Sequence, residues 1–314
     1  MSKIVMVGSG VVGTATGKGF LLHGHDVTFV DINHGRLTAL KSEGLNATDR
    51  LELSPEPAII FLTLPTPHSG AKYDLSVFIK GVRDVGDALG SDTAFHTVVV
   101  RSTVPPGTSD DLVLPLLEQH SGKKVGQGFA LASAPEFLRA ATALEDFLAP
   151  WMTVVASRSE RTTEHLVQLF RPFGGEVRTF MRPAEAEMVK CVHNIYNAAK
   201  ISFWNEIWSV SQALGLDCDA VSATVALSAE GSTNPQYGIQ GGAPYGGACL
   251  PKDTNGFLGF ARTRGIQMPL LESVIMVNER MEALANREFE DLADARVAPA
   301  VVDLSETTRE SESA

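Results

Sequence analysis

The chain opens with Lys3-Ile4-Val5-Met6-Val7-Gly8-Ser9-Gly10-Val11-Val12-Gly13, and this stretch decides the fold. Its apolar start predicts a buried strand, and its glycines predict a tight turn into a helix that runs to about Leu22. In such a unit Gly8 permits the turn, Gly10 permits close approach to a pyrophosphate, and Gly13 lets the helix pack on the strand. The glycine spacing alone is weak evidence, but a strand before it and a helix after it make a dinucleotide-binding unit the favoured interpretation.

A second predicted strand, 27–30, ends in the acidic residue Asp31. It lies about 20 residues after the glycines, where a carboxylate binds the ribose 2′-hydroxyl of a dinucleotide. Because that carboxylate would repel a 2′-phosphate, the sequence predicts NAD rather than NADP. Val11 and Val12, at the start of the helix, are expected to face the same cofactor.

Further strand patterns alternate with helical ones through the first half of the chain. The apolar runs are 58–64, 97–100, 129–133 and 152–156. Ligands of open parallel sheets bind at the carboxyl ends of the strands, so the loops that carry Pro65, Thr66 and Thr103 should face the cofactor. The fold class is therefore predicted as α/β, with a Rossmann-like, doubly wound sheet in an NAD-binding domain that spans residues 1–182.

Pro183 begins a helical pattern that continues to about Leu214, where Gly215 stops it. At ~1.5 Å per residue this helix would be over roughly 40 Å long. We expect it to be the central helix of an all-α domain, residues 183–290, and the interface of a homodimer. Residues 291–314 are polar, acidic and without periodicity, and are predicted to form a disordered tail.

Composition excludes several classes of protein. The 314 residues include 44% hydrophobic residues and three widely spaced cysteines, and the formal net charge is −11. The cysteines favour a reducing cytoplasm over a disulfide framework, and no His/Cys cluster indicates a metal site. The negative charge argues against nucleic acid as a partner. The N-terminus lacks a signal-peptide pattern, and no apolar run reaches the ~18 residues of a membrane span.

The most informative segment of the second half is Tyr245-Gly246-Gly247-Ala248-Cys249-Leu250-Pro251-Lys252-Asp253. Pro251 suits the first position of a helix, since its missing N–H would be unpaired there. The thiol of Cys249 would then lie at a helix N-terminus, which favours the anionic, nucleophilic form. The alternative is a small buried cysteine beside a flexible loop. This segment alone leaves both interpretations open.

Two polar residues of the predicted long helix share one face, because Lys190 and Asn194 are four residues apart. Glu187 lies on the neighbouring turn. A buried lysine needs a partner or a function, whereas a solvated lysine needs neither. Spacing alone favours a solvated Lys190.

In this order, the motifs resemble those of the UDP-glucose/GDP-mannose dehydrogenase family, from about residue 3 to residue 285. The matching segments are 8–13 with Asp31, 64–67, 102–108, 135–138, 186–194, 200–206 and 246–253. The resemblance implies oxidation of a primary alcohol to a carboxylate, with four electrons passing to two NAD molecules. The aldehyde formed first would be captured by Cys249 as a thiohemiacetal, then oxidised to a thioester that water hydrolyses.

The resemblance also implies roles for the other site residues. Lys190 and Asn194 would stabilise oxyanions at the sulfur adduct. Thr103 and Asp253 would hold a water used in proton transfer, and Glu136 would be the general base for hydrolysis of the thioester. Lys252 would belong to the cofactor-binding residues.

The chain also departs from the family pattern. The family usually has a second glutamate where this chain has Ala140, and an arginine where it has Met152. UDP-glucose enzymes supply an arginine upstream of the cysteine motif, and residues 234–240 contain none. The third domain that normally grips the nucleotide has no counterpart before the polar tail. The expected substrate is therefore a small alcohol such as a nucleoside, free sugar or sugar phosphate, with a sugar nucleotide as the alternative.

Two other functions fit part of the sequence. A two-electron dehydrogenase of the β-hydroxyacid type would share the first domain and a Lys-xxx-Asn pair, but would leave Cys249 without a role. A catalytically silent NAD-binding protein would fit the loss of the glutamate at Ala140. The presence of all six predicted catalytic residues argues against the silent protein.

Overall fold

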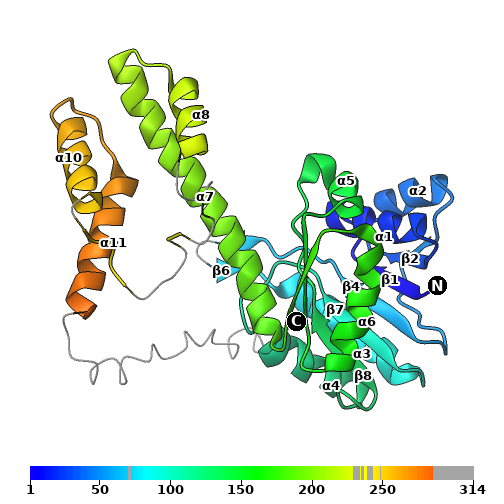
Figure 1. Cartoon of the computed structure of the whole chain (residues 1–314). Helices are drawn as coiled ribbons and strands as arrows, with labels where there is room; N and C mark the ends of the chain where they lie inside the picture. The colour runs from blue at the N-terminus through cyan, green and yellow to red at the C-terminus, as the bar shows by residue number, and fades with distance from the viewer. Residues whose placement is uncertain (70–71, 229–233, 235–236, 239–242, 248, 286–314) are drawn as a thin grey trace. The chain divides into compact units, whose positions relative to one another are not determined.

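The computed structural model describes these parts of the chain: residues 1–69, 72–228, 234, 237–238, 243–247 and 249–285 (Figure 1). They form two compact units, Met1–Tyr196 and Asn197–Ala314, which are described separately. The division lies inside the long helix, whereas the sequence places the boundary at 182/183. The predicted tail at 291–314 lies outside the described residues.

An eight-stranded sheet organises the first unit. Its strands are β1 Lys3–Val7, β2 Asp26–Val30, β3 Ala47–Thr48, β4 Ala58–Leu62, β7 His96–Val100, β8 Phe129–Ser133, β9 Met152–Ala156 and β10 Glu176–Phe180. They lie in the order β10-β9-β8-β7-β4-β1-β2-β3. All neighbouring pairs are parallel except β8 and β9, which meet antiparallel at Ser133 and Ala156. The run from β3 to β8 has the Rossmann order, so the predicted fold class is confirmed.

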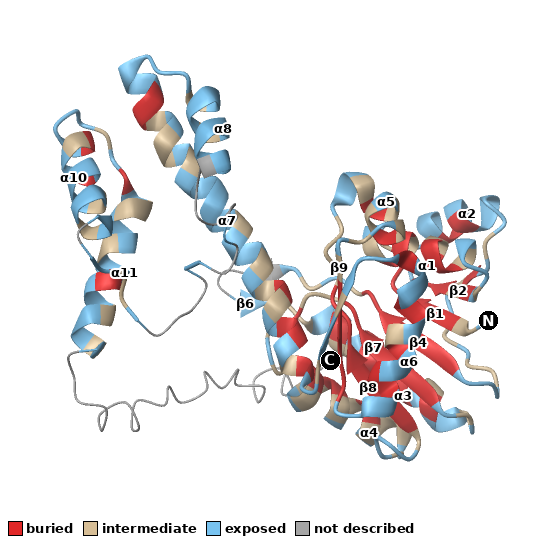
Figure 2. Cartoon of the chain, in the orientation of Figure 1, coloured by how far each residue is buried: buried red, intermediate tan, exposed pale blue. Residues whose placement is uncertain are grey.

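Helices cover both faces of this sheet. They are α1 Val11–Leu22, α2 His34–Ser42, α3 Ser76–Ser91, α4 Leu114–Ser121, α5 Ala143–Leu148 and α6 Glu160–Phe170. One core, on the α1, α5 and α6 side, is built around Phe20, Phe147 and Phe170, and the other around Phe78 and Leu117 from α3 and α4. Figure 2 shows that burial is concentrated in the strands. Each such buried side chain contributes roughly 1.5–3 kcal/mol, which explains why the central strands are continuous apolar runs.

Shorter elements complete the first unit. They are the strand pair β5 His68–Ser69 and β6 Lys72–Tyr73, the π-helix Ser109–Val113, and 3-10 turns at Ala140–Thr142 and Arg171–Phe173.

The second unit is helical. The predicted long helix is confirmed as α7, Pro183–Leu214; its residues from Asn197 onward belong to this unit, and Gly215 ends it with φ +64°. The remaining helices are α8 Cys218–Ser228, α10 Leu250–Arg262 and α11 Pro269–Ala285. A small core of Val210, Leu258, Ala261 and Met268 joins α7, α10 and α11.

None of the described helices is long and apolar enough to cross a bilayer. Within the same residues, His, Cys, Asp and Glu side chains form no group of three or more that would hold a metal ion.

Candidate active site

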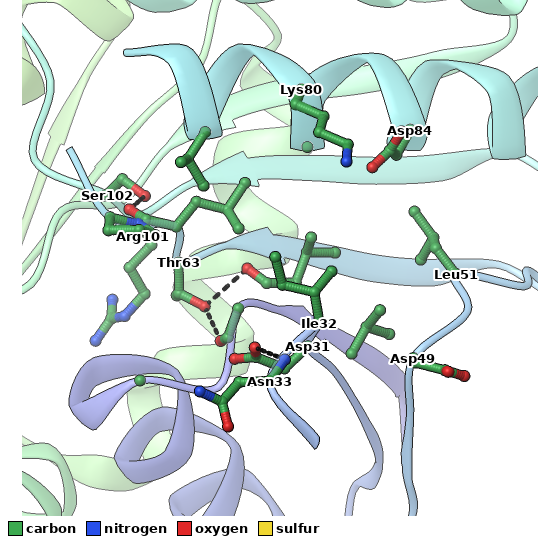
Figure 3. Close-up of a pocket in the computed structure, with 18 of the residues that line it drawn as sticks. Asp31, Ile32, Asn33, Asp49, Leu51, Thr63, Lys80, Asp84, Arg101 and Ser102 are labelled. Carbon is green, nitrogen blue, oxygen red and sulfur yellow. Dashed lines mark hydrogen bonds between the residues drawn. The ribbon is translucent and has the colours of Figure 1, made fainter. Parts of the chain in front are cut away.

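A cavity of about 1250 Å³ lies at the carboxyl ends of the central strands in the first unit. Residues from the loops after β1, β2, β4 and β7 line it, and several are labelled in Figure 3. The strand order reverses between β1 and β4, which is the point at which open α/β sheets bind dinucleotides.

The glycine turn shapes one wall of the cavity. Gly8 has φ +98°, a conformation that favours glycine. A Cβ on Gly13 would lie 2.0 Å from the Gly8 carbonyl oxygen, so only glycine permits the packing of α1 there. A Cβ on Gly10 would meet nothing within 4 Å, which leaves the backbone open to a close ligand. Val11 and Val12 also line the cavity.

Asp31 is buried at the end of β2 and held in a fixed orientation. Its Oδ2 accepts a hydrogen bond from the Ser9 amide at 2.7 Å. Its Oδ1 accepts one from the Asn33 amide at 2.8 Å, and Figure 3 shows Asp31 beside Asn33. Arg36 Nη1 lies 3.4 Å from Oδ2. The chain thus presents a carboxylate and a guanidinium at the cavity wall, and both suit the hydroxyls of an adenosine ribose. Sequence reasoning missed Arg36, although its place one turn into the helix after Asp31 was a usable signal.

Hydroxyl groups tie the neighbouring loops together. Thr63 Oγ1 donates to the Gly8 carbonyl at 2.6 Å, and Ser102 Oγ donates to the Leu64 carbonyl at 2.7 Å. Thr66 Oγ1 donates to the Thr103 carbonyl at 2.5 Å. The cavity is lined by Pro65 and Thr66 from the loop after β4 and by Thr103 from the loop after β7. Thr63 is a further site residue that its apolar strand pattern did not reveal.

Lys190 and Glu136 form an ion pair at the edge of this unit's core. Lys190 Nζ lies 3.1 Å from Glu136 Oε1, and the two side chains are only 7% and 11% exposed. Glu136 Oε2 accepts from the Leu138 amide at 2.5 Å, and Lys190 Nζ stands 5.4 Å from the centre of the Phe137 ring. The expectation of a solvated Lys190 is wrong. The lysine is buried because a carboxylate from the loop after β8 compensates its charge.

Glu187 fixes the start of α7 to the loop after β7. This buried carboxylate accepts from the Gly107 amide at 2.6 Å and from the Ser109 amide at 2.9 Å. Burial raises the pKa of the Glu187 carboxyl, and the two N–H donors act against that rise. Because Glu187 is one turn before Lys190, this contact sets the position of Lys190 relative to the loop of Thr103.

Aromatic side chains border the ion pair. His193 packs edge-on against Phe137, with ring centres 5.1 Å apart, and stacks on Trp151 at 5.8 Å. Burial, and then the charge of Lys190, lower the pKa of His193, which favours the neutral imidazole. The exposed Asn194 follows on α7. Neither Trp151 nor His193 belongs to a recognisable sequence motif.

Cys249 lies in the second unit as the N-cap residue of α10. It is exposed, contrary to the alternative of a small buried cysteine. The helix starts at Leu250, one residue earlier than Pro251 predicts, and the Asp253 amide donates to the Cys249 carbonyl at 2.9 Å. Lys252 Nζ and Asp253 Oδ1 are 3.2 Å apart on the exposed surface.

The structure thus brings together two groups of predicted residues. Glu136 and Lys190 are in contact in the first unit, where Thr103 lies on the loop that Glu187 holds. Cys249, Lys252 and Asp253 form the first turn of a helix in the second unit. Of the arginine-free segment 234–240, only residues 234, 237 and 238 are described.

The sheet order, the glycine turn and the carboxylate at the end of β2 define a Rossmann-type dinucleotide-binding protein. Models of the UDP-glucose/GDP-mannose dehydrogenase family match the chain at residues 43–174, as the NAD binding domain, and at residues 184–280, as the central domain. A ketopantoate reductase model matches residues 4–80 and covers only the first part of the sheet.

Individual relatives agree with these matches. UDP-glucose 6-dehydrogenase AglM of Haloferax volcanii is 33% identical, over 94% of this chain and 74% of the relative. GDP-mannose 6-dehydrogenase of Pseudomonas putida is 34% identical, over 88% of this chain and 68% of the relative. A crystal structure of GDP-mannose dehydrogenase from Pseudomonas aeruginosa superposes with a TM-score of 0.82 at 28% identity, covering 92% of this chain and 72% of that one.

The chain belongs to the UDP-glucose/GDP-mannose dehydrogenase family. It is accordingly an NAD-dependent enzyme, which confirms the predicted family and cofactor. The buried Asp31, the open backbone at Gly10 and the size of the cavity fit that cofactor.

Two glycine variants separate folding from cofactor binding. We expect Gly13→Ala to lower the free energy of unfolding by about 1–3 kcal/mol, because its Cβ collides with the Gly8 backbone. Gly10→Ala should unfold like wild type, because its Cβ would meet no protein atom within 4 Å. It should bind NAD more weakly, because the Cβ would occupy space beside the turn where the cofactor approaches the backbone. Chemical denaturation and calorimetric titration with NAD would measure the two effects. Wild-type affinity in Gly10→Ala would contradict the placement of the cofactor beside this turn.

A second test concerns Glu187. In Glu187→Gln one of the two backbone N–H groups loses its acceptor, so we expect the free energy of unfolding to fall by about 1–3 kcal/mol. The exposed Glu164 on α6 provides the matched control, and Glu164→Gln should have no effect. Equal stability of the two variants in urea titrations would show that the Glu187 contacts contribute nothing.

Proposed function

We propose that this enzyme oxidises the primary alcohol of a nucleotide sugar to a carboxylate in two successive NAD-dependent steps through Cys249. The observation that carries the proposal is the buried ion pair of Lys190 and Glu136 in the NAD-binding unit. The exposed Cys249 at the N-terminus of α10 supplies the nucleophile. Domain boundaries at 1–182 and 183–290 are part of the same proposal.

The chemistry follows from the residues. When bound, NAD would supply the hydride acceptor, one molecule for each of the two oxidations, with NADH replaced by a second NAD between them. Between them, the thiolate of Cys249 adds to the aldehyde carbon, and the carbonyl oxygen becomes the oxyanion of a thiohemiacetal. The second oxidation leaves a thioester, and attack by water releases the carboxylate and restores the thiol. The covalent link keeps the aldehyde from leaving between the two oxidations.

Lys190 supplies the positive charge for the oxyanions of this sequence. A cation that is already fixed and shielded from water stabilises a developing oxyanion more than a mobile, solvated cation does. Its partner Glu136 holds it in one orientation. Asn194, on the same face of α7, donates to the same oxygen in this proposal, and Thr103 and Asp253 hold a water for proton transfer.

Glu136 acts as the general base of hydrolysis in this scheme. One of its oxygens accepts from the Leu138 amide, and the other faces Lys190. A carboxylate held at both oxygens keeps one orientation toward an attacking water, while its remaining lone pairs accept the proton. Glu136 therefore both orients Lys190 and activates the water.

The relatives favour a nucleotide sugar as substrate. Their names describe UDP-glucose and GDP-mannose 6-dehydrogenases, and the chain spans 74% and 68% of the first two. The alternative substrates are a free sugar, a sugar phosphate and a nucleoside, and an activity assay should include them. The three free cysteines fit a reducing, cytoplasmic setting.

We further propose a homodimer through α7. Large apolar side chains are exposed along this helix, among them Ile195, Ile201 and Trp208. Isologous packing of two such helices would bury these side chains. Neither nucleic acid nor a membrane is part of the proposed function.

The count of NADH per limiting substrate tests the chemistry. With UDP-glucose, GDP-mannose and the smaller alcohols, we expect two NADH and one carboxylate for the true substrate. Cys249→Ser should form no carboxylate, and Lys190→Met should lower kcat by roughly 10²–10³-fold. One NADH per substrate, with no effect of Cys249→Ser, would instead identify a two-electron dehydrogenase.

The dimer has its own test. Sedimentation equilibrium should give twice the chain mass of 33.6 kDa. Trp208→Glu should shift that equilibrium toward monomer, because two carboxylates would enter the apolar interface. A monomeric wild type at micromolar concentration would refute the interface.

A further inference from the structure

A buried amide in the second unit holds the backbone of one residue near the cysteine. Asn278, on α11, is only 7% exposed. Its Oδ1 accepts from the Tyr245 amide at 2.7 Å, and its Nδ2 donates to the Tyr245 carbonyl at 3.1 Å. Both backbone groups of Tyr245 are thus satisfied by one side chain 33 residues away, much as a neighbouring strand would satisfy them.

A carboxylate one turn along the helix fixes the direction of this amide. The second Nδ2 hydrogen of Asn278 is donated to Glu282 Oε1 at 3.0 Å. An ionised carboxylate only accepts hydrogen bonds, so the amide nitrogen must face Glu282 and the Tyr245 carbonyl. The amide oxygen is then the acceptor for the Tyr245 N–H. Aspartate has no donor and leucine has neither group, so asparagine is the suitable residue here.

Tyr245 is also tied to the helix of the cysteine. Its hydroxyl donates to Thr254 Oγ1, on α10, at 3.5 Å. The Thr254 hydroxyl in turn donates to the Leu250 carbonyl at 2.8 Å, in the first turn of α10. Tyr245 therefore joins α11 to α10 just before the point where α10 begins.

Two glycines follow Tyr245 on the way to Cys249. They are Gly246 and Gly247, and Gly247 has φ +79°. A Cβ on either glycine would meet no atom of the described residues within 4 Å, so neither glycine has a side chain that could hold this backbone by packing. Its direction depends on the residue at which the glycines start.

We propose that Asn278 is a positioning residue for the nucleophile: by holding the Tyr245 backbone, it fixes how the chain enters Cys249 and orients the thiol at the start of α10. This inference rests on the proposed function, because it takes Cys249 as the nucleophile. Loss of the amide lets the glycine segment move and takes the sulfur out of its line of attack. A displacement of about 1 Å can lower the rate of an oriented reaction by roughly 10²-fold.

The test compares Asn278→Ala, Asn278→Asp and Cys249→Ser with wild type in the full-length enzyme. Asn278→Asp keeps an acceptor for the Tyr245 amide but loses the donor to its carbonyl. Ser273→Ala is the matched control, since Ser273 is exposed on α11 and its hydroxyl donates to the Pro269 carbonyl of the same helix. The measurements are thermal unfolding, kcat and KM with UDP-glucose and GDP-mannose, aldehyde trapped by hydroxylamine, and the rate of alkylation of Cys249 by iodoacetamide.

We expect Asn278→Ala to be folded at the assay temperature and to form carboxylate about 10- to 100-fold more slowly, with KM nearly unchanged. Trapped aldehyde should rise, because the first oxidation does not use the thiol, and the alkylation rate of Cys249 should change. Asn278→Asp should lie between Asn278→Ala and wild type, and Ser273→Ala should match wild type. If Asn278→Ala is too unstable to assay, the same pattern in Asn278→Asp supports the proposal.

Other outcomes overturn it. Wild-type carboxylate formation and alkylation in Asn278→Ala would show that the amide does not position Cys249. A loss of both oxidations in proportion to the unfolded fraction would assign Asn278 a structural role only. Full carboxylate formation by Cys249→Ser would refute the proposed function itself, and with it the role of Asn278. Loss in Cys249→Ser beside normal turnover in the Asn278 variants would refute only the present inference.

Discussion

The first unit depends on one buried ion pair, that of Lys190 and Glu136. An unpaired charge is unfavourable where water is largely excluded, as it is around this pair. Removing one partner of a buried ion pair typically lowers the free energy of unfolding by about 3–5 kcal/mol. The pair therefore obliges the loop after β8 and the first turns of α7 to meet. Glu187 adds a second contact, from the same helix to the loop after β7. Together they explain why the compact first unit extends to Tyr196, beyond the last strand of the sheet.

In each unit, buried polar side chains fix a part of the chain that carries a proposed catalytic residue. In the first, Glu136 pairs with Lys190, and Glu187 ties the same helix to the loop after β7; in the second, Asn278 holds the backbone of Tyr245, four residues before Cys249. A rigid parallel sheet supplies the cofactor site, with glycines where a ligand must come close to the backbone. The shared fold therefore provides the scaffold, and a few non-local polar contacts hold the segments that carry the proposed catalytic residues Lys190 and Cys249.

The sequence predicts those features that depend on residues close together in the chain. The first strand, the glycine turn and Asp31 are recognisable because their spacing is set by one βαβ unit, and α7 because nothing interrupts its pattern over 183–214. Strand β10 is not predicted, because it is a polar edge strand without an apolar run. The burial of Lys190 depends on Glu136, 54 positions earlier, and no spacing rule reveals such a contact. Thr63 and Asn278 escape for the same reason, because their partners lie 55 and 33 positions away.

The most direct test of the account is the mass of the enzyme during turnover. In Glu136→Gln the proposed general base is absent, so the proposed mechanism predicts slow hydrolysis of the thioester while the oxidations still deliver it. Mass spectrometry after acid quench should then find a substrate-derived acyl group on the peptide that contains Cys249. An unmodified Cys249 peptide in a variant that still produces NADH would contradict covalent catalysis at this residue.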